Sequence, residues 1–152
     1  MVYIELLDSI NDSDMKNILE VWDSSIISTH NFLNEDDINK IRPFVKEAAD
    51  NVEHLFCARD SNGIIVAFIG IHDKKIEMLF VHDDYRGKGI GKRLVMHGLS
   101  IFSIEYVNVN EQNPTAVGFY EYMGFETFKR SEFDEQGNPF PILHMKLKMF
   151  YI

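Results

Sequence analysis

The chain has 152 residues, of which 45% are hydrophobic and 26% charged, and its formal net charge is -9 at pH 7. This length predicts a single domain over 1–152. Nucleic-acid binding needs a basic face and a membrane span needs an apolar run of about 18 residues, so an acidic chain without such a run fits neither partner. One cysteine excludes an internal disulfide and favours a reducing cytoplasm.

The N-terminal third predicts one strand and two helices. The opening stretch YIELL favours a strand. Apolar residues recur at helical spacing over 12–28, where Asp12 or Ser13 is the expected cap. Residues 35–50 predict a second helix that begins with three acids, which the helix dipole favours. Pro43 lies inside this helix and predicts two pieces or a kink.

The middle of the chain predicts an antiparallel run. Residues 54–60 and 64–73 are strand-like, and the Ser-Asn-Gly between them is a hairpin signal. A third strand over 75–82 follows after another short turn. A helix is expected from about 89 to 103, and an alternating strand over 104–110.

The last third begins with a helix over 113–123. Asn113 is its expected cap, a proline suits its first turn, and Gly124 can end it. Strands over 125–131 and 141–148 flank the turn sequence DEQGNP. The order β-α-α-β-β-β-α-β-α-β-β predicts a mixed α/β (α+β) fold.

The glycine-rich stretch HDDYRGKGIG, at 82–91, runs from a strand into the start of a helix. The first turn of a helix presents free N–H groups and a partial positive charge, and glycines let an anion approach them closely. Arg86, Lys88, Lys92 and Arg93 add a local basic patch to an acidic chain. We therefore expect an anion site here, with a plain tight turn as the alternative.

Two common phosphate signatures fail in this loop. For a Walker A loop, Arg86 occupies the first glycine position and Arg93 the hydroxyl position. For a Rossmann fingerprint, Lys92 replaces the third glycine. The pattern that remains is [RQ]-x-x-G-x-[GA], filled by Arg86, Gly89 and Gly91.

This pattern resembles motif A of the GNAT superfamily of N-acetyltransferases. IEMLFVHDDYRGKGIGKRL is similar to the family's fourth strand, pyrophosphate loop and third helix, and NEQNPTAVGFYEYMGFE to the end of its fifth strand and its fourth helix. NEQNPTAVGFYEYMGF, RSEFDEQGNPFPILHMKL and WDSSIISTHNFL resemble the YjaB-like bacterial members. The resemblance implies the acyl-CoA N-acyltransferase fold, with a central, mostly antiparallel twisted sheet and helices on both faces.

The same resemblance implies acetyl-CoA as acetyl donor, in a cleft between strands 75–82 and 104–110. The backbone of Leu79, Phe80 and Val81 would face the pantetheine arm. The pyrophosphate loop and the helix start would supply Arg86, Gly87, Lys88, Gly89, Ile90, Gly91 and Lys92. No metal is expected, because the six histidines and the cysteine lack ligand spacing.

Tyr120 is the leading catalytic candidate, since it matches the family tyrosine whose hydroxyl lies near the coenzyme A sulfur as general acid. Ala116 is four residues earlier, so the two share one helix face and leave room for a slender ligand. The alternative for Tyr120 is a core tyrosine. Asn113 is expected both to cap the helix and to contact the cofactor.

The base is expected at Glu77, directly or through a water, because several family members keep an acid on this strand. Simple alternation would place Glu77 on the face of Leu79 and Val81. His30 lies in the region that forms the family's acceptor pocket, and an imidazole suits proton transfer. His72 and His144 are less favoured, and each of these side chains has a structural role as its alternative.

The predicted function is transfer of an acetyl group from acetyl-CoA to a primary amine by direct attack in a ternary complex. The acceptor is a small amine or a peptide or protein amine, and acids near the expected pocket favour a cationic one. A non-catalytic acyl-CoA sensor or a partner-binding module on the same fold is the alternative. Such folds often dimerise, so a homodimer is one open alternative to a monomer.

Overall fold

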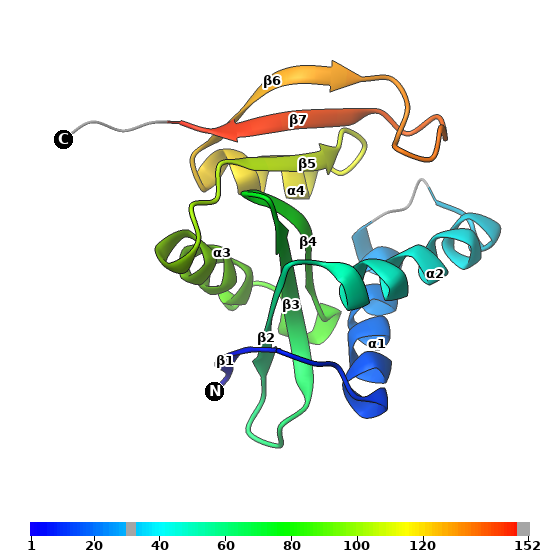
Figure 1. Cartoon of the computed structure of the whole chain (residues 1–152). Coiled ribbons are helices and arrows are strands. Elements are labelled where there is room, and N and C mark those ends of the chain that lie inside the picture. The colour runs from blue at the N-terminus through cyan, green and yellow to red at the C-terminus, as the bar shows by residue number, and fades with distance from the viewer. Residues whose placement is uncertain (30–32, 149–152) are drawn as a thin grey trace.

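The computed structural model describes residues 1–29 and 33–148, and in this part of the chain seven strands form one sheet (Figure 1). The strand order is β1-β2-β3-β4-β5-β7-β6, and the join between β4 and β5 is parallel, while the other pairings are antiparallel. The mixed α/β fold and the mostly antiparallel sheet are confirmed. The strands are β1 (Tyr3–Leu6), β2 (His54–Arg59), β3 (Ile65–His72), β4 (Lys75–Val81), β5 (Tyr106–Asn110), β6 (Phe125–Ser131) and β7 (Ile142–Leu147).

Four α-helices lie among the described residues: α1 (Asp12–Thr29), α2 (Glu35–Asn51), α3 (Ile90–Ile101) and α4 (Pro114–Tyr122). A 3-10 turn, η1 (Asp83–Tyr85), which the sequence did not predict, lies between β4 and α3.

Two predictions about helix ends and breaks need correction. The cap of α1 is Asn11, whose Oδ1 accepts the N–H of Asp14 at 2.7 Å, and not Asp12 or Ser13, which lie inside the helix. Of the two alternatives expected at Pro43, the break into two pieces is wrong, because α2 is one continuous helix. A capping box at Asn34 fixes its start, and its buried Val45 packs in the same core as α1, which outweighs the one hydrogen bond that proline removes.

The helices cover both faces of the sheet, with α1 and α2 on one side and α3 on the other (Figure 1). Alternate residues of β2 divide between the two cores: Leu55 and Cys57 pack with α1 and α2, whereas Phe56 and Ala58 pack with α3. α3 approaches the sheet closely at Gly98, where an added Cβ would lie 2.9 Å from Cδ1 of Ile71 on β3. The expected arrangement of helices on both faces is therefore confirmed.

A β-bulge interrupts β4 at Glu77. Ile71 pairs with Ile76 and Gly70 with Met78, so Glu77 is left between two consecutive pairs. Ile76 packs in the α3 core and Met78 in the α1–α2 core, although residues two apart in a regular strand share a face. The simple alternation expected through this strand is thus broken at Glu77.

The parallel join of β4 and β5 is short. Lys75 pairs with Tyr106 and Ile76 with Val107, and the register pairing ends there, just before the bulge. The remaining residues of the two strands diverge, so the sheet opens at its centre. This opening positions the site described next.

Candidate active site

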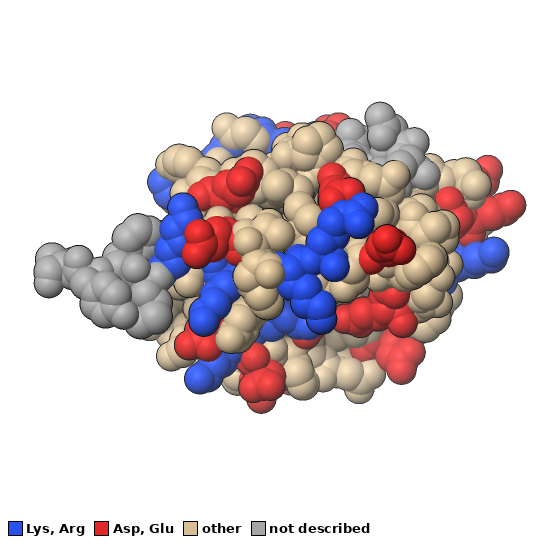
Figure 2. Space-filling model, turned by 90° about the horizontal axis from the view of Figure 1, so that it is seen from above, with Lys and Arg blue, Asp and Glu red and all other residues tan. Residues whose placement is uncertain are grey.

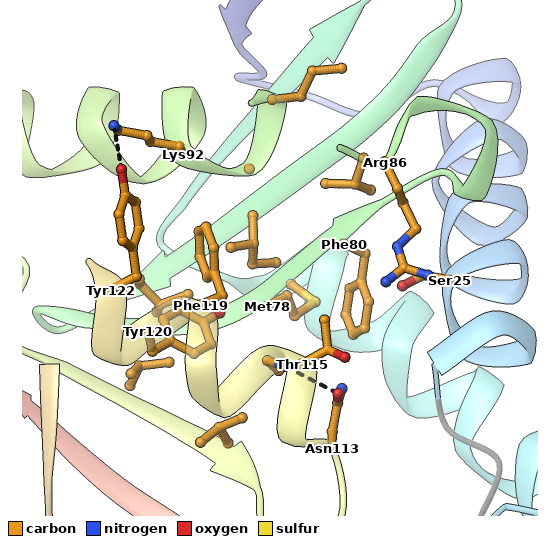
Figure 3. A pocket seen from close by; sticks show the side chains of 18 of the residues that line it. Ser25, Met78, Phe80, Arg86, Lys92, Asn113, Thr115, Phe119, Tyr120 and Tyr122 are labelled. Atoms are coloured by element: carbon orange, nitrogen blue, oxygen red, sulfur yellow. Dashed lines mark hydrogen bonds between the residues drawn. The ribbon is translucent and has the colours of Figure 1, made fainter. Parts of the chain in front are cut away.

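A cavity of about 600 Å3 fills the opening between β4 and β5 (Figure 3). The described cofactor-site candidates line it with one exception, Lys88. The lining candidates are Leu79, Phe80, Val81, Arg86, Gly87, Gly89, Ile90, Gly91, Lys92, Asn113, Ala116 and Tyr120. Residues that the sequence places in three separate segments are therefore brought together around one space.

The glycine loop forms one end of this cavity. Gly87 and Gly89 have φ angles of 75° and 78°, a left-handed conformation that glycine adopts without strain. Gly89 is the N-cap of α3, and the first intrahelical bond that follows joins the N–H of Arg93 to its carbonyl at 3.0 Å. The N–H groups of the first turn have no intrahelical partner and are suited to an anion.

Cationic side chains extend this end of the cavity. Figure 3 shows Arg86 reaching from the loop towards Ser25 of α1, and Lys92 meeting Tyr122 of α4. Lys92 Nζ donates to the Tyr122 hydroxyl at 3.0 Å and lies 5.2 Å from that ring. Lys88 points elsewhere, with its ammonium 5.2 Å from the centroid of the Tyr85 ring.

Tyr120 lies where the cavity meets the protein core. Its side chain is 7% exposed and packs against Phe119 and Phe125, yet it also lines the cavity. Burial raises the pKa of the Tyr120 phenol far above its ordinary value. The hydroxyl therefore stays protonated at neutral pH and is available as a hydrogen-bond donor.

Asn113 caps α4, as the sequence predicts. Its Oδ1 accepts the N–H of Ala116 at 3.1 Å, and its side chain also borders the cavity (Figure 3). Gly124, with a φ of 101°, follows the last turn of this helix. The short helix is thus fixed at both ends, which holds Tyr120 in place.

A second, smaller cavity of about 410 Å3 adjoins the first. Ile76, Glu77 and Asn108 line both, so the two spaces meet at the β4 bulge. The remaining wall comes from β6, β7 and the loop that connects them: Ser131, Phe133, Asp134, Glu135, Gln136, Ile142 and His144. The charged residues of the described lining are all acidic.

This acidic lining is a local feature of the molecule. On the face seen in Figure 2, basic and acidic side chains are interspersed over the end of the molecule that carries β6 and β7. One such pair joins Arg130 and Glu111, with Nε and Oε2 2.6 Å apart. The net charge of -9 therefore does not by itself make every surface acidic.

Glu77 occupies the junction of the two cavities. Its carboxylate lies 3.5 Å from Lys75 Nζ, and its side chain is 34% exposed. The bulge directs this residue out of the regular strand pattern, which is a common role of bulges beside functional sites. This position suits a side chain that contacts ligands in both cavities.

Other candidate residues lie apart from these cavities or outside the described residues. His30 is among the latter. His72 accepts the N–H of Glu53 through Nδ1 at 3.3 Å and lines neither cavity. Cys57 is fully buried, and burial raises the pKa of its thiol to about 11, which disfavours a reactive thiolate. No group of three His, Cys, Asp or Glu side chains among the described residues is placed to hold a metal.

Sequence reasoning missed part of the lining. Met78 faces the main cavity because Gly70 opposite leaves it room; an added Cβ there would lie 2.6 Å from Met78 Cε. Asn108 borders both cavities, although nothing in the sequence marked it beyond an alternating strand. Tyr122 was visible as a second tyrosine near the end of the helix, but its contact with Lys92 depends on the packing of α4 beside α3.

Comparison with known proteins decides the family. The acetyltransferase (GNAT) domain model matches residues 13–149. The chain belongs to the GNAT acetyltransferase family. It is 35% identical over 130 residues to the peptidyl-lysine N-acetyltransferase YjaB of Salmonella typhimurium, covering 86% of this chain and 89% of that protein.

Solved structures of GNAT proteins agree with this fold. The solution structure of apo YjaB from Escherichia coli matches with a TM-score of 0.83 at 31% identity, over 96% of this chain and 97% of that one. The crystal structure of the PaiA N-acetyltransferase from Thermoplasma acidophilum in complex with coenzyme A matches with a TM-score of 0.66 at 19% identity, over 97% and 99%. This GNAT protein is an acetyltransferase that acts on amines, as the sequence predicts. None of its described helices is both long and apolar enough to cross a bilayer.

Proposed function

We propose that this acetyltransferase moves the acetyl group of acetyl-CoA to the primary amine of a cationic acceptor, with a lysine side chain of a peptide or protein as the favoured class. One observation carries the proposal: a cavity bordered by a glycine loop and a helix start that are suited to an anion adjoins an acidic cavity, and Glu77 and Asn108 border both. The YjaB relatives, which are named peptidyl-lysine N-acetyltransferases, support the choice of lysine.

In this proposal acetyl-CoA occupies the larger cavity. Its pyrophosphate lies on the loop at 86–91 and the first turn of α3, beside Arg86 and Lys92. Its pantetheine arm follows the free edge of β4 at Leu79–Val81, where the divergence of β5 leaves backbone groups without strand partners from β5. The acetyl group then reaches the part of the larger cavity near its junction with the smaller one, in the space that Glu77 and Tyr120 both line.

The acceptor amine attacks the thioester carbonyl directly. A lysine-like amine is protonated at pH 7, and presenting it neutral costs about 4–5 kcal/mol. Glu77 attracts the ammonium and receives its first proton, directly or through a water. The nitrogen–carbon bond forms, the carbon–sulfur bond breaks, and Tyr120 donates its hydroxyl proton to the departing thiolate.

Tyr120 suits this role because its phenol stays protonated. Its raised pKa makes it a weak acid in isolation, but a thiolate formed in the same water-poor space is a stronger base than in water. The same phenol also stabilises negative charge on sulfur through a hydrogen bond that forms only as the thiolate develops.

Thermal unfolding with acetyl-CoA tests the donor, with ATP and NAD as controls. At about a hundredfold excess over Kd, a ligand stabilises the fold by roughly 2.7 kcal/mol, which for a domain of this size raises Tm by about 5–10 °C. Release of coenzyme A in the presence of a lysine-containing peptide then tests the transfer. A shift with acetyl-CoA but no release with any amine would favour a non-catalytic acyl-CoA sensor. No shift, or a larger one with ATP, would contradict acetyl-CoA as the donor.

A further inference from the structure

His144 and Ser131 meet in the wall of the smaller cavity. His144 is on β7 and Ser131 is the last residue of β6, and Nε2 of the imidazole lies 2.8 Å from the serine Oγ. A bulge at Phe128 shifts the register of the two strands, so that Thr127 pairs with Met145 but Lys129 pairs with His144. This hydrogen bond engages Nε2 of the imidazole and leaves Nδ1 as the other ring nitrogen.

The imidazole is one strand away from the junction of the two cavities. His144 is the register partner of Asn108 on β5, and paired residues of antiparallel strands project to the same side. Asn108 and Glu77 line both cavities, and His144 lines the smaller one with them. An acceptor amine that enters through the smaller cavity therefore has His144 beside its path to the thioester.

The proposed reaction requires two proton acceptors for one nitrogen. The acceptor begins as an ammonium with three protons and ends as an amide with one. The first proton leaves before the attack, and the second leaves the nitrogen after it has bonded to the acetyl carbon. Glu77 accounts for the first, and the second needs another base near the junction, because Tyr120 acts as an acid at the sulfur.

The charges around His144 keep it neutral at pH 7. Burial and the positive charges of Lys129 on β6 and Lys75 on β4 lower its pKa below the ordinary 6.5, while Glu135 in the β6–β7 loop opposes this shift. Glu77 lines the same smaller cavity as His144. A neutral imidazole whose Nε2–H donates to a hydroxyl presents the lone pair of Nδ1, which can accept a proton.

We propose that His144, in the tautomer whose Nε2–H donates to Ser131 Oγ, is the base that takes the second proton from the acceptor nitrogen, through Nδ1 directly or across one water, and that Ser131 is the positioning residue that holds the orientation of its ring. The assignment rests on the proposed acetyl transfer. The proton taken up by His144 passes to solvent through the open cavity before the next turnover, so the imidazole returns to its neutral form.

Steady-state kinetics of coenzyme A release test this, with acetyl-CoA and a lysine-containing peptide between about pH 5 and 9. We expect His144→Gln to lower kcat about a hundredfold and to remove the acid limb of the kcat profile that lies below pH 6.5. The KM for acetyl-CoA and the thermal shift that it induces should stay unchanged, which also shows that the variant folds. His72→Gln is the matched control and should retain the wild-type profile.

Ser131 provides a second pair of variants. Ser131→Ala should lower kcat by less than His144→Gln does, and Ser131→Thr, which keeps the hydroxyl, should restore it. Glu77→Gln should instead raise the KM for the peptide and also lower kcat, because it removes both the attraction for the ammonium and the acceptor of its first proton. The assignment of His144 is wrong if the wild type is active and His144→Gln keeps both its kcat and the acid limb of its pH profile. If His144→Gln does not fold, a fully active Ser131→Ala likewise contradicts the assignment. A wild type that transfers acetyl to no amine would overturn the proposed function and this assignment together.

Discussion

The two adjoining cavities are built in opposite ways. The larger is lined by a contiguous loop, two diverging strands and a short capped helix, and the groups proposed to bind an anion are mainly backbone N–H groups. The smaller is formed by side chains from four strands and a hairpin loop, and the chemistry proposed for it depends on Glu77, Ser131 and His144. The proposed cofactor site thus depends on local backbone geometry, whereas the proposed acceptor site depends on side chains that are far apart in the sequence.

Tyr120→Phe should have the largest effect, because Tyr120 lines the larger cavity and is the proposed proton donor to the leaving thiolate. Loss of the donor to the thiolate should lower kcat about a hundredfold or more, with the affinity for acetyl-CoA nearly unchanged. Single-turnover coenzyme A release and an acetyl-CoA titration measure the two quantities. Tyr3→Phe, at an exposed position on β1 that lines neither cavity, is the control and should keep kcat near the wild-type value. Equal losses of turnover and affinity in Tyr120→Phe would indicate a structural tyrosine.

Gly89→Ala should affect only the larger cavity. An alanine at a φ of 78° is strained by about 1–2 kcal/mol in a residue that lines the cavity, and its Cβ would project into open space, since no protein atom lies within 4 Å of it. We expect acetyl-CoA to bind about tenfold more weakly, which corresponds to about 1.4 kcal/mol, with the peptide KM unchanged.

The control for this change is Gly63→Ala. Gly63 has a φ of 81° in the β2–β3 turn and is equally free of neighbours, so it carries the same strain away from both cavities. It should lower Tm as much as Gly89→Ala does and leave acetyl-CoA affinity intact. Similar affinity losses in both variants would mean that strain, rather than the loop's contact with the cofactor, causes the effect.

Glu135→Gln should affect only the smaller cavity and should have the smallest effect. Glu135 is exposed in the β6–β7 loop, so solvent screens its attraction for a cationic acceptor. We expect the peptide KM to rise two- to threefold at low salt, a difference of about 0.5 kcal/mol that should shrink as salt is added. Glu132→Gln, a neighbouring acid that lines neither cavity, should leave KM unchanged. If neither change alters the peptide KM, the charge of the acceptor does not contribute to its selection.

The larger cavity was predictable because its residues are neighbours in the sequence. The loop at 82–91 and the capped helix that begins after Asn113 have recognisable glycine and cap patterns, and strand punctuation gave the element order. The smaller cavity was not predictable, because the Ser131–His144 contact depends on a bulge that shifts the pairing register of β6 and β7 by one residue. Local spacing likewise could not reveal the bulge at Glu77, which appears only when β3 and β4 are paired.

Local rules also failed where packing or a neighbouring residue overrode them. Pro43 weakens a helix considered alone, but the face that carries Val45 and Ala49 is buried, and this burial keeps α2 intact. Asn11 caps α1 although two capping residues follow it, because several caps in succession leave the choice to the surrounding contacts.

The two-residue join between β4 and β5 has a consequence for how the chain folds. The sheet has two halves. In one, β1 to β4 pair antiparallel, each with the next; in the other, β6 and β7 form a hairpin and β5 pairs with β7. Among the described strands, only the short pairing of β4 with β5 joins the two halves. Joining them requires the crossover through α3, a slower event than closing a hairpin. We expect the halves to order first and the join to form late. A cofactor bound across both halves should therefore slow unfolding while leaving the refolding rate almost unchanged.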